Sequence, residues 1–167
     1  HADAGTMALW MSRIDQVLAG RRDRKGIIHT VSYARRDFIA GHSRYGGRML
    51  LHDSGNTQEV VERFRRSREA VVLVSPSLGT GYDFPGRDCE FQVIAKIPYP
   101  DERPALMQAR KKVDKEYVPY LTGQSLVQIC GRGTRSERDR CENVIVDDYV
   151  RRFMGQYGHE IPEWWKR

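Results

Sequence analysis

Five short runs of apolar residues recur along the chain and are separated by longer segments of mixed polarity. Runs of this length that are rich in Val, Ile and Leu are typical of strands buried on both faces of a sheet. The pattern predicts five strands, at residues 26–32, 48–52, 70–75, 91–97 and 143–147.

The intervening segments carry apolar residues at the three-to-four spacing of amphipathic helices. Gly20 is expected to end the first helix, and Thr57 is expected to cap the third. The predicted helices cover residues 7–18, 33–40, 57–64, 103–117 and 123–130, and a short helix follows the last strand. Strands that alternate with helices predict an α/β fold whose mainly parallel sheet is covered on both faces.

The organisation of the chain is expected to be simple. Residues 1–6, which precede Met7, are interpreted as a cloning remnant, and residues 7–167 as one domain. We expect neither a leader peptide nor a membrane-spanning helix, because the start is not basic and no apolar run approaches the roughly 20 residues of a span. The composition, with 40% hydrophobic and 30% charged residues, is that of a globular protein.

Charge and cysteine content narrow the expected chemistry. The net charge of +6 favours a polyanionic partner, although charge alone is a weak signal. The three cysteines, Cys89, Cys130 and Cys141, are widely spaced and form no Cys-x-x-Cys pair, so we expect reduced thiols and no metal site. Cys130 is interpreted as a small core residue.

The segment 128–135 has the pattern Gln-x-x-Gly-Arg-x-x-Arg. Arg132 and Arg135 lie three residues apart beside glycines, so both guanidinium groups can address one phosphate, and arginine binds phosphate through paired hydrogen bonds. An arginine finger of this kind stabilises charge in phosphoryl transfer. A solvated basic loop is the alternative, and it is the favoured reading for Arg138 and Arg140.

The segment 75–86 follows the clearest predicted strand and contains several glycines and hydroxyl side chains. Its glycines permit close approach of the backbone to a ligand, and Asp83 is a candidate to accept a hydrogen bond from a ribose hydroxyl. An ordinary glycine turn is the alternative. We expect this loop, the strand end near Thr30 and the segment 128–135 to lie side by side at the carboxyl ends of the strands.

The end of the first predicted strand is a candidate for nucleic-acid contact. Thr30, Ser32, Arg35 and Arg36 supply hydroxyls and cations suited to a sugar-phosphate backbone. His29 lies among them, but a histidine in an apolar run is interpreted as a satisfied core residue, and it is assigned no catalytic role.

In chain order, the segments at residues 27–33, 75–86 and 128–135 resemble motifs IV, V and VI of superfamily 2 helicases. Gly81-x-Asp83 falls at the Gly-x-Asp position of motif V and Ser75 at its nucleic-acid-contacting Thr or Ser, whereas Thr80 departs from the usual Glu or Arg. Residues 96–100, the Arg-Ser-x-x-Asp segment at 135–139 and the strand after it are similar to XPD/DinG-type members. Over about residues 8–165 the chain resembles their C-terminal RecA-like domain, a three-layer α/β sandwich.

The resemblance implies half of an ATP site. Arg132 and Arg135 would reach the γ-phosphate, Gly81 and Asp83 would contact the nucleotide, and Gln128 would couple it to DNA held by Thr30, Ser32, Ser75, Arg35 and Arg36. No Gly-x-x-x-x-Gly-Lys-Ser/Thr segment occurs in the sequence, so ATP and Mg²⁺ would be bound mainly by an N-terminal RecA-like domain of the parent protein. The chain alone is expected to be inactive as an ATPase, and no metal ligand is assigned to it.

The implied partners are single-stranded DNA, traversed 5′ to 3′, and the N-terminal motor domain of the same parent protein. The implied location is the cytoplasm, for a protein encoded by a bacterium or a phage. Two alternatives remain. One is the translocase domain of another superfamily 2 motor, of the restriction or defence type. The other is a non-catalytic nucleic-acid-binding domain with a helicase-like fold, against which the intact arginine pair argues. The C-terminal tryptophans Trp164 and Trp165 are interpreted as packing residues.

Overall fold

A computed structural model describes residues 3–76, 78, 82–133 and 140–166. The chain divides into two compact units, which we describe separately. The first unit comprises residues 1–96 and 132–147, and the second comprises residues 97–131 and 148–167.

The first unit contains a five-stranded sheet in the order β2-β3-β1-β4-β5, and every neighbouring pair is parallel. Its strands are β1 (Gly26–His29), β2 (Met49–Leu51), β3 (Val72–Ser75), β4 (Phe91–Ile94) and β5 (Glu142–Ile145). All five predicted strands are present, which confirms the parallel α/β fold. The first ends earlier than predicted, because Val31 adopts a positive φ of 65° and Ser32 is the N-cap of the next helix.

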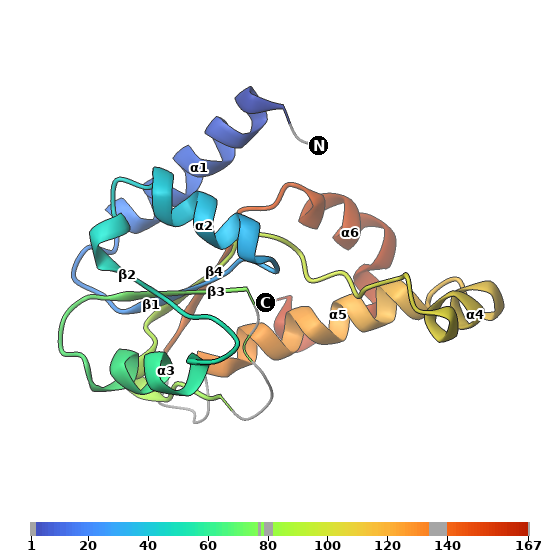
Figure 1. Cartoon of the computed structure of the whole chain (residues 1–167). Coiled ribbons are helices and arrows are strands. Elements are labelled where there is room, and N and C mark those ends of the chain that lie inside the picture. Colours follow the sequence, from blue (N-terminus) through green and yellow to red (C-terminus); the bar gives the residue numbers. More distant parts are fainter. Residues whose placement is uncertain (1–2, 77, 79–81, 134–139, 167) are drawn as a thin grey trace. The chain divides into compact units, whose positions relative to one another are not determined.

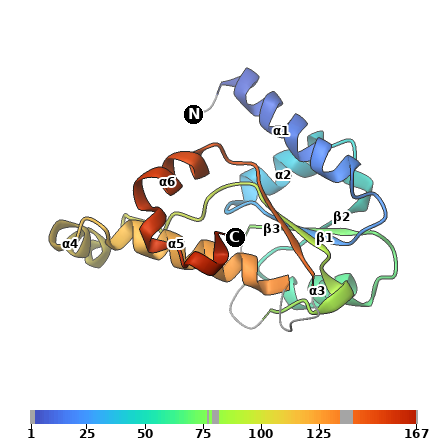
Figure 2. The ribbon, with the colours of Figure 1, turned by 180° about the vertical axis from the view of Figure 1, so that it is seen from behind.

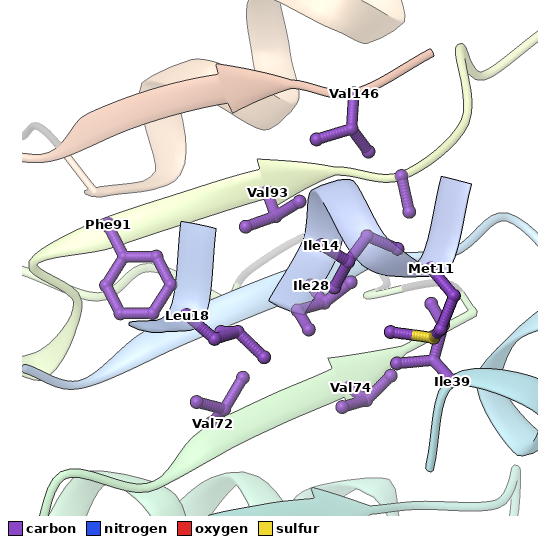
Figure 3. Close-up of a cluster of buried hydrophobic side chains, with 11 residues drawn as sticks. Met11, Ile14, Leu18, Ile28, Ile39, Val72, Val74, Phe91, Val93 and Val146 are labelled. Atoms are coloured by element: carbon purple, nitrogen blue, oxygen red, sulfur yellow. The ribbon is translucent and has the colours of Figure 1, made fainter. Parts of the chain in front are cut away.

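Helices α1 (Ala4–Ala19) and α2 (Tyr33–His42) cover one face of this sheet, on the opposite side from α3 (Figures 1 and 2). Side chains from α1 interdigitate with alternate strand residues, as Figure 3 shows for Ile14 against Ile28 and Val93. This face buries Met11, Ile14, Leu18, Ile28, Ile39, Val72, Val74, Phe91, Val93, Ala95 and Val146.

Helix α3 (Thr57–Arg66) covers the other face and completes the three layers. Its residues Val61 and Phe64 pack with Ile27, Leu73 and a smaller set from the loops. The loop residues of this cluster are Leu78, Phe84 and Cys89.

The amino ends of α1 and α3 differ from the sequence predictions. Helix α1 begins at Ala4 rather than Met7, because the Asp3 carboxylate accepts a hydrogen bond from the Thr6 N–H at 2.9 Å. The N-cap of α3 is Asn56, so the prediction of Thr57 as the cap is wrong. The Thr57 hydroxyl instead donates to the Asp53 carbonyl at 2.8 Å.

The second unit contains α4 (Ala105–Val113), α5 (Tyr117–Cys130) and α6 (Tyr149–Tyr157), with a core of Ile97, Phe153 and Ile161. The sequence predicts helices at residues 103–117 and 123–130, but α4 ends at Val113 and α5 already begins at Tyr117. The predicted break between them is therefore too late in the chain. Pro119 lies in its first turn, where a missing N–H costs no helical hydrogen bond. Short 3₁₀ helices occur at Gly46–Arg48, Gly86–Asp88, Gly131–Gly133, Gly158–Glu160 and Glu163–Trp165. Among the helices of the described residues, none has the length and apolarity needed to cross a membrane.

Candidate functional site

Arg132 fastens the segment after α5 to the glycine-rich loop that follows β3. Its Nη1 donates to the Tyr82 carbonyl at 2.9 Å and its Nη2 donates to the Leu78 carbonyl at 3.0 Å. The Arg132 carbonyl accepts a hydrogen bond from the Phe84 N–H at 3.0 Å. Arg132 is 8% exposed and is held by these three hydrogen bonds against Leu78, Tyr82 and Phe84 of the loop.

The route by which these segments meet differs from the prediction. Arg132 follows a helix and precedes β5, so its segment is not one of the loops that leave the carboxyl end of a strand. The expectation that all three segments gather at the carboxyl ends is therefore wrong for this one. Contact with the glycine-rich loop occurs because that loop runs from the end of β3 to the start of β4, and Arg132 meets it partway.

The start of the same loop is joined to the end of β1. The Thr30 N–H donates to the Ser75 carbonyl at 2.9 Å, and the Thr30 hydroxyl lies 3.2 Å from that carbonyl and 3.0 Å from the Ser32 carbonyl. Both residues are buried. The two predicted nucleic-acid segments are thus neighbours, but these two hydroxyls hold the loops together from within.

His52 is a site residue that sequence reasoning missed. Its Nε2 lies 2.7 Å from the Ser75 Oγ, and its Nδ1 lies 3.1 Å from the Thr57 Oγ1. Burial lowers the pKa of this imidazole. The pairing of β2 with β3 explains this contact. Leu51 pairs with Val74, so the residues that follow them, His52 and Ser75, lie opposite each other.

Ser32 and Arg35 lie at the amino end of α2, where Ser32 is the N-cap. The Ser32 Oγ accepts from the Arg35 N–H at 3.3 Å, and the Arg35 Nη1 lies 3.4 Å from the same oxygen. Both side chains are half-buried. A helix amino end with an adjoining cation is a favourable place for an anion.

Arg36, predicted to contact nucleic acid, is buried in an ion-paired cluster. Its guanidinium lies 2.6 Å from the Asp37 carboxylate and 2.8 Å from the Asp53 carboxylate, and it also donates to the His52 carbonyl. These contacts tie α2 to the turn after β2. The same cluster holds His52 and, through it, Ser75 in place.

Residues 22–167 match the family described as the helicase C-terminal domain. The chain belongs to this family. A search of curated proteins gave no match.

Solved structures place this helicase C-terminal domain among RecA-like folds. It is similar to Xpd4 of S. tokodaii, with a TM-score of 0.63 and 18% identity, over 95% of this chain and 33% of that one. The DEAD-box protein SrmB of E. coli, solved bound to RraA, gives 0.61 and 16% over 94% and 81% of the two chains. Domain 2 of the DEAD-box helicase Mss116p, solved bound to an RNA duplex, gives 0.61 and 12% over 93% and 55%. The chain spans about a third of the length of Xpd4.

The remaining predicted residues of the helicase domain are placed unevenly. Asp83 is half-buried, and its carbonyl accepts from Arg65 of α3 at 2.7 Å, a second support for the loop that the sequence did not reveal. Gln128 is exposed on α5, in the second unit. Gly81 and Arg135 lie outside the described residues.

His29 behaves as the satisfied core histidine that was predicted. It is 5% exposed, its Nε2 lies 2.8 Å from the Gln92 Oε1, and the Gln92 amide donates to the Asn143 Oδ1 at 3.0 Å. Burial lowers its pKa to about 4, with a further contribution from the positive charge of Arg132. His29 therefore carries a neutral imidazole at physiological pH.

Proposed function

We propose that this helicase C-terminal domain is the second motor lobe of an ATP-dependent DNA helicase of the XPD/DinG type. The observation that supports it best is that both predicted sites are hydrogen-bonded to the loop after β3: Arg132 donates to the Leu78 and Tyr82 carbonyls, and the Thr30 N–H donates to the Ser75 carbonyl. This shared loop would connect the predicted phosphate-binding arginine to the predicted nucleic-acid contacts. A motor needs such a connection, because binding and hydrolysis of ATP must change how the domain holds the nucleic acid.

On the nucleotide side, Arg132 and Arg135 would contact the γ-phosphate, and Gly81 and Asp83 the remainder of ATP. ATP supplies the phosphoryl group, and Mg²⁺, held mainly by the N-terminal motor domain, would neutralise part of its charge. The Arg132 guanidinium fits this role, since the two carbonyls that it contacts keep it beside the loop. It would exchange those neutral acceptors for phosphate oxygens, which form stronger, charge-assisted hydrogen bonds.

On the nucleic-acid side, Ser32 and Arg35 would make the direct phosphate contacts, because they lie half-buried at the amino end of α2. Thr30, Ser75 and Arg36 would act indirectly, because their buried hydrogen bonds and ion pairs fix the chain after β1 and after β3. That Mss116p domain 2 was solved bound to an RNA duplex supports a nucleic-acid role for this domain. Gln128 would help to couple the two sides.

The first test is the DNA-stimulated ATPase activity of the full-length parent. Arg132→Ala and Arg135→Ala should each lower kcat by roughly three orders of magnitude, the lower range for an arginine finger. Arg140→Ala is the matched control, since Arg140 is an exposed cation of the same basic stretch, and it should keep parental turnover. Parental turnover in Arg135→Ala would overturn the arginine-finger role, and equal losses in all three variants would indicate a general charge effect.

The second test addresses the partner. The parent should bind single-stranded DNA without sequence preference, with an affinity that falls as salt rises. Arg35→Ala should weaken that binding and reduce its salt dependence by about one phosphate contact. Preferential stimulation by RNA would replace the DNA assignment with an RNA helicase, and binding that is insensitive to salt would remove the phosphate-contact role.

A further inference from the structure

Two cysteines from distant parts of the sequence lie side by side in the first unit. Cys89 lies just before β4, and Cys141 immediately precedes β5. Because Phe91 pairs with Glu142 in the parallel register of these strands, the residues that lead into them are neighbours. The two Sγ atoms are 3.7 Å apart, close to van der Waals contact, and both thiols are reduced.

The two thiols have different surroundings. Cys89 is fully buried, and its Sγ donates to the Phe91 carbonyl at 3.1 Å. Cys141 is only partly buried. The contact with Cys141, together with burial, raises the pKa of Cys89 well above its usual value, whereas the contact with Cys89 lowers the pKa of Cys141. Cys141 is thus the more reachable and more readily ionised thiol, and Cys89 is its protected neighbour.

This pair touches the arginine segment. A Cβ added at Gly133 would lie 2.3 Å from the Cys141 Sγ and 2.6 Å from its Cβ. The Cys141 sulfur therefore rests against the main chain of the residue that follows Arg132, and only glycine permits so close an approach. A change in the position of this sulfur acts directly on the backbone that carries the arginine.

We propose that Cys89 and Cys141 form a reversible dithiol–disulfide site that controls the Arg132 segment. The Cys141 thiolate attacks a low-molecular-weight disulfide such as oxidised glutathione, forms a mixed disulfide and releases one glutathione thiolate. The Cys89 thiol gives up its proton, which the released glutathione thiolate takes up, and the resulting thiolate attacks the Cys141 sulfur and releases the second glutathione. In sum, the two thiols lose two electrons and two protons, and oxidised glutathione becomes two reduced molecules.

Bond formation would change the packing at Gly133. The sulfur atoms must approach from 3.7 Å to a bond length of about 2.0 Å, and we expect the less buried Cys141 to make most of this movement at its contact with Gly133. The site itself is independent of the function proposed above. The regulatory consequence, loss of turnover on oxidation, rests on that proposed function.

The site is tested on the 167-residue chain with oxidised glutathione, followed by alkylation and peptide mapping. The expected product is a Cys89–Cys141 linked peptide in a chain that has lost about 2 Da, with Cys130 still alkylated. Cys89→Ser should accumulate the mixed disulfide on Cys141, and Cys141→Ser should leave Cys89 unmodified. Cys130→Ser is the matched control and should behave as the parent chain. Links through Cys130, links only between chains, or no mixed disulfide in Cys89→Ser would overturn the site.

The regulatory consequence is tested on the full-length parent. Oxidation should lower DNA-stimulated ATPase activity at least about tenfold, dithiothreitol should restore it, and Cys141→Ser should be insensitive to oxidation. A disulfide that forms with unchanged turnover would overturn regulation while leaving the site intact. Failure of the motor role would show separately, as parental activity in the reduced Arg132→Ala and Arg135→Ala variants.

Discussion

The two faces of the central sheet are built from the same strands but carry different chemistry. Strand residues that face α1 and α2 include Ile28, Val72, Val74, Phe91 and Val93. On the α3 side, alternate positions of the same strands include Ile27 and Leu73 but also His29, Ser75 and Gln92. The face toward α1 and α2, here called the apolar face, is packed with apolar side chains whose burial stabilises the fold. The face toward α3, here called the polar face, also buries polar side chains at the carboxyl ends of the strands.

The largest expected effect is on the apolar face. Ile14→Ala removes a fully buried side chain of α1 and should lower the free energy of unfolding by about 3 kcal/mol, measured by urea denaturation. Leu9→Ala, on the same helix but 56% exposed, should change it by less than about 0.5 kcal/mol. Similar losses in both variants would mean that α1 does not pack on this face as described.

On the polar face, stability should depend on pH through His29. Its folded-state pKa of about 4 lies below the ordinary 6.5, so the unfolded chain binds the proton first as pH falls. The contribution of the neutral His29 imidazole to the free energy of unfolding is complete above pH 6.5. It is lost as the pH falls from 6.5 to 4, by as much as roughly 3 kcal/mol. His29→Gln should flatten the stability profile in that window, whereas His42→Gln, at an exposed imidazole, should not. A profile unchanged by His29→Gln contradicts the burial of a neutral imidazole.

Ser75→Ala should have a smaller effect on the same face. It removes the partner of the buried His52 Nε2, and we expect a loss of about 1 to 2 kcal/mol in the free energy of unfolding. Ser12→Ala, at an exposed position of α1, should cost almost nothing. Adding His52→Leu to Ser75→Ala should cost less than the sum of the two single changes, because the orphaned nitrogen is removed. Strict additivity would argue against this hydrogen bond.

The smallest effect is expected at the margin of the polar face, where β1 ends. Val31 has a φ of 65°, which is costly for a β-branched residue, and it is 36% exposed. Val31→Gly should therefore raise the free energy of unfolding by roughly 0.5 kcal/mol. Val113→Gly, at the exposed last residue of α4, should lower it by roughly 0.4 kcal/mol. A loss at Val31 equal to that at Val113 would show that the positive φ stores no strain.

The sequence predicted the apolar parts of the sheet better than the details of its polar face. The apolar runs predicted all five strands and the parallel sheet, because such runs are the direct imprint of burial on both faces. Strand ends were less accurate, since a single backbone conformation at Val31 and a cap at Ser32 ended β1 early. The motif pattern identified Arg132 and the glycine-rich loop as related, and the structure joins them.

Three features of the first unit could not be predicted from the sequence. His52 lies 23 residues from Ser75 and has no motif of its own, so only strand pairing reveals the bond. Arg36 reads as a phosphate ligand, yet Asp37 and Asp53 occupy its guanidinium. Cys89 and Cys141 are 52 residues apart and form no spacing motif, and only the register of β4 and β5 brings them together.

The sequence by itself determined the fold class, the family and the residue types available for phosphate contact, because periodicity and short motifs are properties of neighbouring positions. Tertiary structure alone decided which of those residues are turned inward: Thr30, Ser75 and Arg36 are buried, whereas Ser32 and Arg35 lie nearer the surface. It also decided the Arg132 contacts and the cysteine pair. The physical reason is that burial and hydrogen-bond partnership depend on groups brought together from distant positions, and the local pattern does not encode which distant groups arrive.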